Sequence, residues 1–421
     1  MTKNISKIAV LGSGIMGSGI ACHFANIGVE VILLDICPKE LNENEIKQNL
    51  SLDSKKVKNR IVNDMFQKCI KSRPSPIYNK KFIERIRLGN FEDDIDKINE
   101  VDWIIEVVIE KLDIKKSIFD LVEKHRRPGT IVTSNTSGIP IKLMNEGRSD
   151  DFKKSFAITH FFNPPRYLNL FEVVPGPDCN KDVLDFLLEY GEKFLGKTSV
   201  LAKDTPAFIG NRIGIFGIMS LFHQIKNGEY SVEEVDKLTG PAIGRPKSAT
   251  FRTADIAGLD TMCHVANGVY DKCKDDELRE VFKLPDFLQR MLDNNMLGSK
   301  TGQGFYKKIK DENGKSKILA LDLKTFEYND QKKVSYETLK NARKCRKRDE
   351  KFRTLISGND KASEFYKENF ARMFGYVQNR IPEISDDITS IDAALKTGFG
   401  WKDGPFEIWN YIGVREGVKL M

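Results

Sequence analysis

The stretch IAVLGSGIMGSGIACHFANIGVEVILLD, residues 8 to 35, decides the fold class of this 421-residue chain. An apolar run precedes GSGIMG, which has the spacing GxGxxG, and an apolar helix-like segment follows it directly. This order of strand, glycine turn and helix is typical of the first unit of a dinucleotide-binding sheet. Gly12 permits the tight turn, Gly14 lets a pyrophosphate approach bare backbone, and Gly17 lets the helix pack close to the strand. The N-terminal amides of that helix would then hold the anion.

The second apolar run of the same stretch ends in Asp35, eighteen residues after Gly17. A carboxylate at this spacing binds the ribose hydroxyls of a dinucleotide. It would repel a ribose 2′-phosphate, and the next three residues, 36 to 38, are Ile, Cys and Pro and include no arginine to attract one. We therefore expect NAD rather than NADP. The alternative is a glycine-rich turn that binds no cofactor.

Short runs rich in valine and isoleucine recur along the first half of the chain, at 8–12, 29–35, 101–108, 130–135 and 156–162. Helix-like segments separate most of them, which predicts an α/β Rossmann-type, doubly wound parallel sheet. A lysine-rich insert at 46–76 has apolar residues at helical spacing and predicts a helical pair outside the sheet. In LAKDTPAF (201–208), Asp204 and Pro206 stand where a helix would be capped and started, so we expect a domain boundary there.

Helical periodicity replaces the strand pattern after residue 208, which predicts an all-α second part with an internal repeat. Residues 235–260 align loosely with 391–414, matching Asp236 with Asp392, Gly244 with Gly400, and Phe251 with Phe406. The turn DENGK between FYKKIK and SKILAL predicts a small β-hairpin. The expected domains are a Rossmann domain (1–203), a first helical repeat (204–310), a hairpin linker (311–330) and a second repeat (331–421) within which the chain is expected to stop.

Composition restricts the class of partner and the compartment. The net charge of +7 suits an acidic ligand, but 67 Lys and Arg are interleaved with 60 acidic residues, so nucleic acid is not expected as a partner. Seven scattered cysteines without a CxxC motif indicate reduced thiols, a cytoplasmic location and no metal site. The first apolar run is too short for a signal peptide or a membrane span, so no membrane association is expected.

His160 is one of only five histidines, and it lies at the end of an expected strand with Glu172 twelve residues later in a second apolar run. Oxidation of a secondary alcohol needs a base with a pKa near neutrality, which histidine supplies. A Pro-Pro turn and a return strand would place Glu172 beside His160, where the carboxylate would fix the tautomer of the ring. The alternative is that His160 only caps a strand while Glu172 faces solvent.

Further polar groups stand at positions suited to polarise a carbonyl oxygen. SNTS, Ser134 to Ser137, ends the preceding expected strand, and Asn211 follows the domain boundary. A lysine- and arginine-rich run at 342–353 is interpreted as a solvated helix face rather than a binding site for the phosphates of coenzyme A or for nucleic acid.

An ordered set of motifs in this chain resembles the L-3-hydroxyacyl-CoA dehydrogenases of fatty-acid β-oxidation. In sequence order, the set consists of GSGIMGSGIA, Asp35, Glu110, SNTS, HFFNPP with its glutamate, KDTPAFIGNR and GSKTGQGFY. The likeness covers residues 5 to about 308, and the repeated helical part resembles the large bacterial enzymes that also carry an enoyl-CoA hydratase domain. No hydratase activity is expected for this chain. Its insert after Asp35 is longer than in the small mitochondrial-type enzymes, so the residues that contact coenzyme A are not identified.

The resemblance implies NAD as cofactor, His160 as catalytic base, Glu172 as the residue that orients it, and Ser137 and Asn211 as contacts of the substrate oxygens. It also implies a set of residues around NAD: Gly12, Gly14, Ile15, Met16, Gly17, Asp35, Glu110, Lys115, Asn135 and Asn163.

From this resemblance we expect NAD-dependent oxidation of (S)-3-hydroxyacyl-CoA to 3-oxoacyl-CoA, with a homodimer or a pseudo-dimer of the helical repeats closing the cleft. One alternative is a β-hydroxyacid dehydrogenase acting on a substrate without coenzyme A. Its lysine base would stand near the domain boundary, where this chain has Asn211. The other alternative is an NAD-binding scaffold without turnover, if a truncated second repeat leaves the cleft open.

Overall fold

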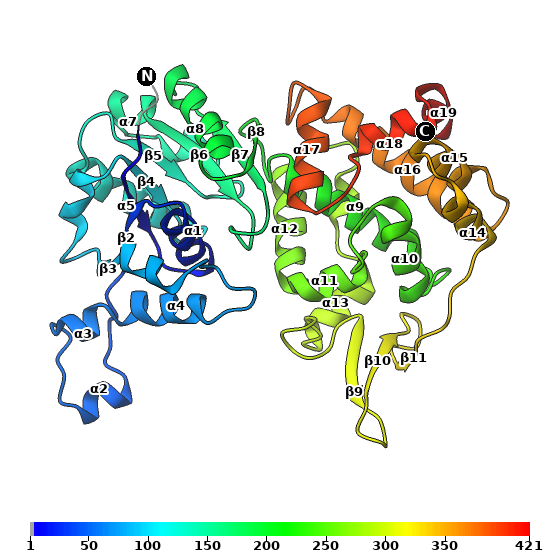
Figure 1. Cartoon of the computed structure of the whole chain (residues 1–421), viewed down its shortest axis with the longest axis horizontal. Helices are drawn as coiled ribbons and strands as arrows, with labels where there is room; N and C mark the ends of the chain where they lie inside the picture. Colours follow the sequence, from blue (N-terminus) through cyan, green and yellow to red (C-terminus); the bar gives the residue numbers. More distant parts are fainter. Residues whose placement is uncertain (1–3) are drawn as a thin grey trace. The chain divides into compact units, whose positions relative to one another are not determined.

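The computed structural model describes residues 4–421, and the chain forms two compact units (Figure 1). The N-terminal unit ends at Phe208, and the C-terminal unit runs from Ile209 to Met421. The boundary expected from the sequence lies slightly earlier, between residues 203 and 204. The large sheet belongs to the first unit, and the second unit is mainly helical, which confirms the expected fold class.

The N-terminal unit is built on an eight-stranded sheet with the order β3-β2-β1-β4-β5-β6-β7-β8. The strands are β1 (Lys7–Leu11), β2 (Glu30–Asp35), β3 (Ile86–Asn90), β4 (Trp103–Glu106), β5 (Ile131–Ser134), β6 (Phe156–Phe161), β7 (Leu170–Pro175) and β8 (Thr198–Leu201). β1 to β6 are mutually parallel, whereas β7 runs antiparallel to β6 and β8 runs parallel to β7. The strand order reverses between β1 and β4, and ligands of such sheets bind at the carboxyl edge beside this point.

Two of these strands, β3 and β8, were not expected from the sequence. Both lie at the edges of the sheet, and each pairs with a single neighbour. An edge strand is only partly covered, so it needs fewer apolar residues than a central strand. The short sequences IRLGN and TSVL therefore lack the continuous apolar run that reveals the central strands.

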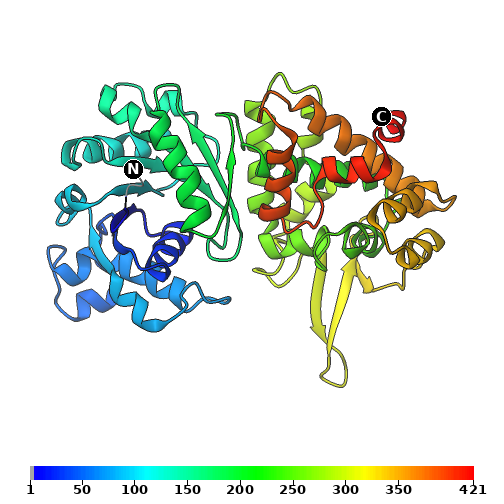
Figure 2. The same cartoon turned by 45° about the horizontal axis from the view of Figure 1, so that its top comes forward.

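Helices on both faces bury the sheet (Figure 2). A cluster of aromatic rings forms part of this core. Phe24 of α1 (Ile15–Asn26) contacts the ring of Trp103 edge to face, with 5.4 Å between centroids. Tyr190 of α8 (Lys181–Lys193) packs against the same tryptophan at 5.8 Å. The other helices of this unit that follow the insert are α5 (Leu112–His125), α6 (Ile141–Met144) and α7 (Asp150–Lys154).

The insert after β2 is helical, as its periodicity predicts. It forms three helices rather than a pair: α2 (Glu43–Lys47), α3 (Lys55–Lys58) and α4 (Arg60–Ile70). A 3-10 turn, η1 (Lys80–Arg85), then leads into β3. In α4, Val62 and Phe66 are buried and belong to the same core as α1, so the insert is anchored to the sheet by one apolar helix face.

The C-terminal unit contains helices α9 to α19 and a small three-stranded sheet. Before the sheet come α9 (Gly210–Ile225), α10 (Val232–Thr239), η3 (Pro241–Ile243), α11 (Phe251–Ala257), α12 (Leu259–Lys272), η4 (Arg279–Phe282) and α13 (Asp286–Asp293). After it come α14 (Glu337–Lys344), α15 (Arg348–Ser357), α16 (Lys361–Asn379), α17 (Ile388–Gly398), α18 (Pro405–Ile412) and α19 (Val414–Leu420). The expected hairpin forms from β9 (Tyr306–Lys310) and β10 (Ser316–Leu321), and β11 (Tyr328–Asp330) adds a third strand.

The expected helix start at Asp204 and Pro206 is wrong. Helix α9 begins at Gly210, because Ala207 and Phe208 have positive φ angles of 65° and 48° and cannot belong to a right-handed helix. The Asp204 carboxylate instead accepts a hydrogen bond from the backbone N–H of Ile141, at 2.8 Å.

The two stretches aligned in the sequence have matching local geometry. The Asp236 carboxylate of α10 accepts backbone N–H groups at the start of α11, and Asp392 of α17 does the same at the start of α18. Gly244 and Gly400, which follow these helices, both have left-handed φ angles, of 75° and 67°. The weak sequence alignment therefore corresponds to two loops of the same construction.

Candidate active site

The glycine turn lies at the carboxyl end of β1, where Gly12 has a φ angle of 107°. A Cβ at Gly12 would lie 2.7 Å from the backbone oxygen of Val107, and one at Gly17 would lie 1.8 Å from the backbone oxygen of Gly12. The turn therefore depends on glycine at both positions for steric reasons.

Gly14 differs from these two glycines because it faces open space. A Cβ there would meet no atom of the described chain within 4 Å, apart from its own neighbours. Gly14 is also the N-cap of α1, and within residues 4–421 no side chain caps this helix end. Exposed backbone N–H groups beside an open surface form the cradle that a pyrophosphate requires. The next residue, Ile15, is 65% exposed.

Asp35 ends β2 and braces the same turn. Its Oδ2 accepts hydrogen bonds from the backbone N–H of Ser13 at 2.6 Å and from the Ser13 hydroxyl at 2.5 Å. Ile36 directly follows β2, and Ile109 lies three residues after the end of β4; they are 54% and 60% exposed. Exposed apolar groups at this edge of the sheet suit the rings of a dinucleotide, so the residues present fit NAD.

A buried ionic network stands at the ends of β4 and β5. The Lys115 ammonium lies 2.8 Å from Oε1 of Glu106 and 3.4 Å from Oε2 of Glu110. Lys115 and Glu106 are buried almost completely, whereas Glu110 is partly exposed. Glu110 thus connects the buried Lys115 to the exposed part of the site. Glu106 was not identified from sequence, although a lone carboxylate within the apolar run VDWIIEVV is an available signal.

Glu110 fixes the loop SNTS after β5. Its Oε1 accepts hydrogen bonds from the Thr136 hydroxyl at 2.5 Å and from the Ser137 backbone N–H at 3.0 Å. Burial acts to raise the pKa of Glu110, but the Lys115 charge and these hydrogen bonds outweigh it and hold the pKa below its ordinary value. An ionised Glu110 at neutral pH therefore keeps the half-buried Ser137 in place. In the same loop, Oδ1 of Asn135 accepts a hydrogen bond from the backbone N–H of Phe161 at 2.9 Å, which connects the end of β5 to β6.

His160 and Glu172 are directly opposite each other in the antiparallel ladder of β6 and β7. The Nδ1 atom of His160 lies 2.6 Å from Oε2 of Glu172, and the glutamate is fully buried. The alternative in which Glu172 faces solvent is therefore wrong. The rings of Phe162 and Phe208 contact the imidazole, with centroids 4.7 and 5.5 Å away, and shield the pair from water.

The loop between β6 and β7 is held by a buried lysine from outside it. Lys197 donates hydrogen bonds to the backbone oxygens of Pro165 and Leu168, the latter at 2.7 Å. Burial lowers the pKa of Lys197 to about 8. The exposed Asn163 in this loop faces a hollow of about 300 Å³ that Ile15 and the insert helix α4 also line.

The remaining predicted site residues divide between the two units. Met16 lies in the first turn of α1. Asn211 lies in the first turn of α9, in the C-terminal unit. Its approach to His160 stays a prediction.

Family models match both units of the chain. Residues 7–205 match the NAD binding domain of 3-hydroxyacyl-CoA dehydrogenase, and residues 208–308 match the C-terminal domain of the same family. The chain belongs to the 3-hydroxyacyl-CoA dehydrogenase family. This membership confirms the resemblance seen in the sequence and identifies the first unit as an NAD-binding domain.

Individual relatives agree with this membership. A probable 3-hydroxyacyl-CoA dehydrogenase of Bacillus subtilis is 49% identical over all 421 residues, which span 53% of that protein. A second, from Deinococcus radiodurans, is 42% identical over 75% of this chain and 86% of its own length. The chain thus spans about half the length of the Bacillus relative. The crystal structure of 3-hydroxybutyryl-CoA dehydrogenase from Escherichia coli superimposes with a TM-score of 0.68 at 19% identity, covering 99% of this chain and 94% of that one, and shows the fold.

No helix within residues 4–421 is both long and apolar enough to cross a membrane.

Proposed function

We propose that this chain is an NAD-dependent dehydrogenase that oxidises (S)-3-hydroxyacyl-CoA to 3-oxoacyl-CoA in fatty-acid oxidation. The observation that carries the proposal is the His160–Glu172 pair, held 2.6 Å apart at the carboxyl edge of a sheet that also presents an open glycine turn. Family membership supports the same activity.

In the proposed reaction, Nε2 of His160 accepts the hydroxyl proton of the substrate. Glu172 accepts the Nδ1–H of the ring, which leaves Nε2 free as the base and stabilises the imidazolium once the proton has moved. NAD, when bound, supplies the acceptor for the hydride that leaves the carbon bearing this hydroxyl group. Gly14 and the N-terminal amides of α1 would bind its pyrophosphate, and Asp35 its ribose.

Ser137 and Asn211 are proposed to hold the substrate oxygen on which charge changes during the reaction. The contacts of Glu110 with the Ser137 loop support the first part of this assignment, since they fix the hydroxyl of the half-buried Ser137 near the end of β5. The basic residues Lys68 and Arg73 line the hollow next to Asn163, which supports this hollow as a contact for the phosphates of coenzyme A.

We also propose that the two helical repeats act as a pseudo-dimer. Contacts between equivalent loops support this arrangement, because Lys402 donates its backbone N–H to the oxygen of Gly244 at 2.8 Å. The guanidinium of Arg245 lies 4.0 Å from the ring centroid of Trp401 in the other loop. A homodimer and a cytoplasmic location remain further parts of the proposal, the latter supported by the unpaired cysteines.

Loss of NADH absorbance on addition of acetoacetyl-CoA to the purified chain tests the activity. We expect turnover by the wild type and by His264→Gln, whose histidine is exposed on α12, and a loss of about 10²–10⁴-fold for His160→Gln. Turnover of acetoacetate in place of its thioester would point to a free-acid dehydrogenase. NADH binding without any turnover would point to a scaffold.

A further inference from the structure

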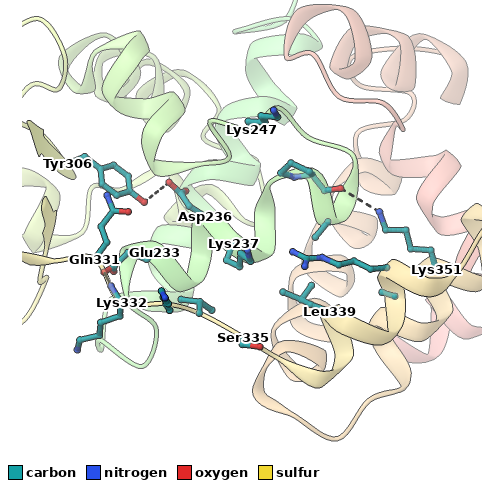
Figure 3. A pocket seen from close by; sticks show the side chains of 16 residues that line it. Glu233, Asp236, Lys237, Lys247, Tyr306, Gln331, Lys332, Ser335, Leu339 and Lys351 are labelled. Atoms are coloured by element: carbon teal, nitrogen blue, oxygen red, sulfur yellow. Dashed lines mark hydrogen bonds between the residues drawn. The ribbon is translucent and has the colours of Figure 1, made fainter. Parts of the chain in front are cut away.

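The C-terminal unit contains a basic hollow that the proposed reaction does not use. Its volume is about 900 Å³, and its walls come from α10, η3, the link between β11 and α14, and helices α14 and α15. A volume of this size accommodates a nucleotide-sized molecule. All of the lining residues belong to one unit, so the hollow is complete within that unit (Figure 3).

Cations outnumber carboxylates in the lining of this hollow. Six basic residues line it: Lys237, Lys247, Lys332, Lys333, Arg343 and Lys351. In the described part of the chain, no carboxylate oxygen lies within 4 Å of the charged side-chain nitrogens of these six, although many other surface lysines form such pairs. Uncompensated cations around one concave space repel each other, and a bound anion would remove that repulsion.

The two carboxylates that line the hollow already have partners. The Asp236 carboxylate accepts hydrogen bonds from three backbone N–H groups. It also accepts one from the Tyr306 hydroxyl, at 2.8 Å (Figure 3). Glu233 accepts the backbone N–H of Lys332 at 3.1 Å. Both carboxylates therefore serve to build the wall, and neither is paired with a basic side chain of the hollow.

Lys351 shows most clearly that a counter-charge is missing. Burial, assisted by the nearby Arg348, lowers its pKa, and within residues 4–421 the one hydrogen-bond acceptor of its ammonium is the backbone oxygen of Pro241, at 3.4 Å. The adjacent carboxylate, Asp403, pairs with Arg348 instead. In Figure 3, Lys237 lies between this side of the hollow and the Tyr306–Asp236 side.

Part of the lining is apolar, which makes the hollow suitable for more than a bare anion. Pro241 and Ala242 of η3 and Leu339 and Ala342 of α14 contribute this surface. We propose that the hollow binds a small organic polyphosphate, whose phosphate groups contact Lys237, Arg343 and Lys351 while its organic part packs on the apolar wall. A long nucleic acid is disfavoured because the cations surround a hollow and do not form a stripe along the surface.

Calorimetric titration of the whole chain tests this proposal, with tripolyphosphate as the first probe and ATP as the organic probe. Saturating NADH is present throughout, so that the glycine turn of the N-terminal unit is already occupied. We expect saturable binding of tripolyphosphate that weakens with added salt, as exposed ionic contacts do, and we expect ATP to compete for the same site.

Two double variants remove the same charge from different places. Lys237→Gln with Arg343→Gln removes two cations from the hollow, whereas Lys340→Gln with Lys344→Gln removes two that α14 carries outside it. We expect affinity for tripolyphosphate to fall about tenfold or more in the first variant, because charge-assisted contacts are lost, and less than about twofold in the second. Unchanged thermal unfolding checks that both variants fold.

Three results would overturn the proposal. The first is no saturable binding to the wild type, and the second is equal weakening in the two double variants, which would indicate only a general charge effect. The third is a single-stranded oligonucleotide that binds more tightly than ATP and depends on the same two side chains. Normal acetoacetyl-CoA reduction by the Lys237/Arg343 variant would separate this site from the catalytic one.

Discussion

Glu172 lies directly opposite His160 in the ladder between β6 and β7, and its Oε2 atom is 2.6 Å from Nδ1 of the histidine. The orientation of the imidazole is therefore set by strand register and by a fully buried carboxylate rather than by a mobile loop. Substitution of Glu172 can therefore measure how much this carboxylate contributes to the reaction rate.

We expect Glu172→Gln to lower kcat by about 10²–10⁴-fold, because the amide cannot stabilise the imidazolium as the carboxylate does. The KM for NADH should stay within about twofold, since the cofactor turn is formed by other residues. Steady-state reduction of acetoacetyl-CoA measures both constants. Glu192→Gln on the exposed side of α8 is the control, and a Glu172→Gln enzyme as fast as this control would contradict the assignment.

Gly14→Ala and Gly17→Ala should fail in different ways. An added methyl at Gly17 would overlap the backbone oxygen of Gly12 at 1.8 Å, so we expect a loss of about 1–3 kcal/mol in the free energy of unfolding. The methyl at Gly14 has open space, so that variant should fold normally and bind NADH at least about tenfold more weakly. Urea unfolding and NADH fluorescence titration distinguish the two effects. Equal loss of stability in both variants would argue against Gly14 as the cofactor cradle.

Lys115→Met should destabilise the N-terminal unit by about 3–5 kcal/mol, because it leaves the buried Glu106 carboxylate without its partner. The next residue supplies a matched control, since Lys116 pairs with Glu146 on the exposed surface. Lys116→Met should cost about 1 kcal/mol or less. Urea unfolding measures both, and adding Glu106→Gln to Lys115→Met should restore part of the loss. Similar costs at 115 and 116 would mean that the buried pair has little structural importance.

The paired aspartates of the helical repeats predict a pH dependence of stability. Burial raises the pKa of Asp236 and of Asp392 to about 6, and the backbone hydrogen bonds offset only part of that effect. Between about pH 4 and pH 6 the folded chain therefore binds protons that the unfolded chain has already released. Stability from these groups is greatest at the acidic end of this window and is lost as the pH rises to about 6.

Urea unfolding at pH 4.5 and pH 7 measures this change for the wild type and for Asp236→Asn. The asparagine has no titrating proton, so the difference between the two pH values should shrink in the variant. Asp286→Asn, at the start of α13, should leave the difference as it is in the wild type. An identical pH dependence in the wild type and Asp236→Asn would show that Asp236 does not contribute.

The sequence predicted the central strands, the glycine turn, the hairpin and the helical nature of the insert, because each depends on residues close together in the chain. It failed at β3 and β8, whose edge positions require little apolar sequence. It also failed at the start of α9, where left-handed residues 207 and 208 override the helix-start signal of Asp204 and Pro206.

By itself, the sequence determined the dinucleotide-binding fold and the choice of His160 and Glu172 as a pair, through local spacing and strand ends. Only the tertiary structure decided that the pair meets, since a register shift of one residue would turn Glu172 to the other face of the sheet. The same holds for Glu106 with Lys115, and for the basic hollow whose walls come from residues 233 to 351. Contacts of this kind join residues far apart in the chain, and packing and register, which set them, leave no local pattern in the sequence.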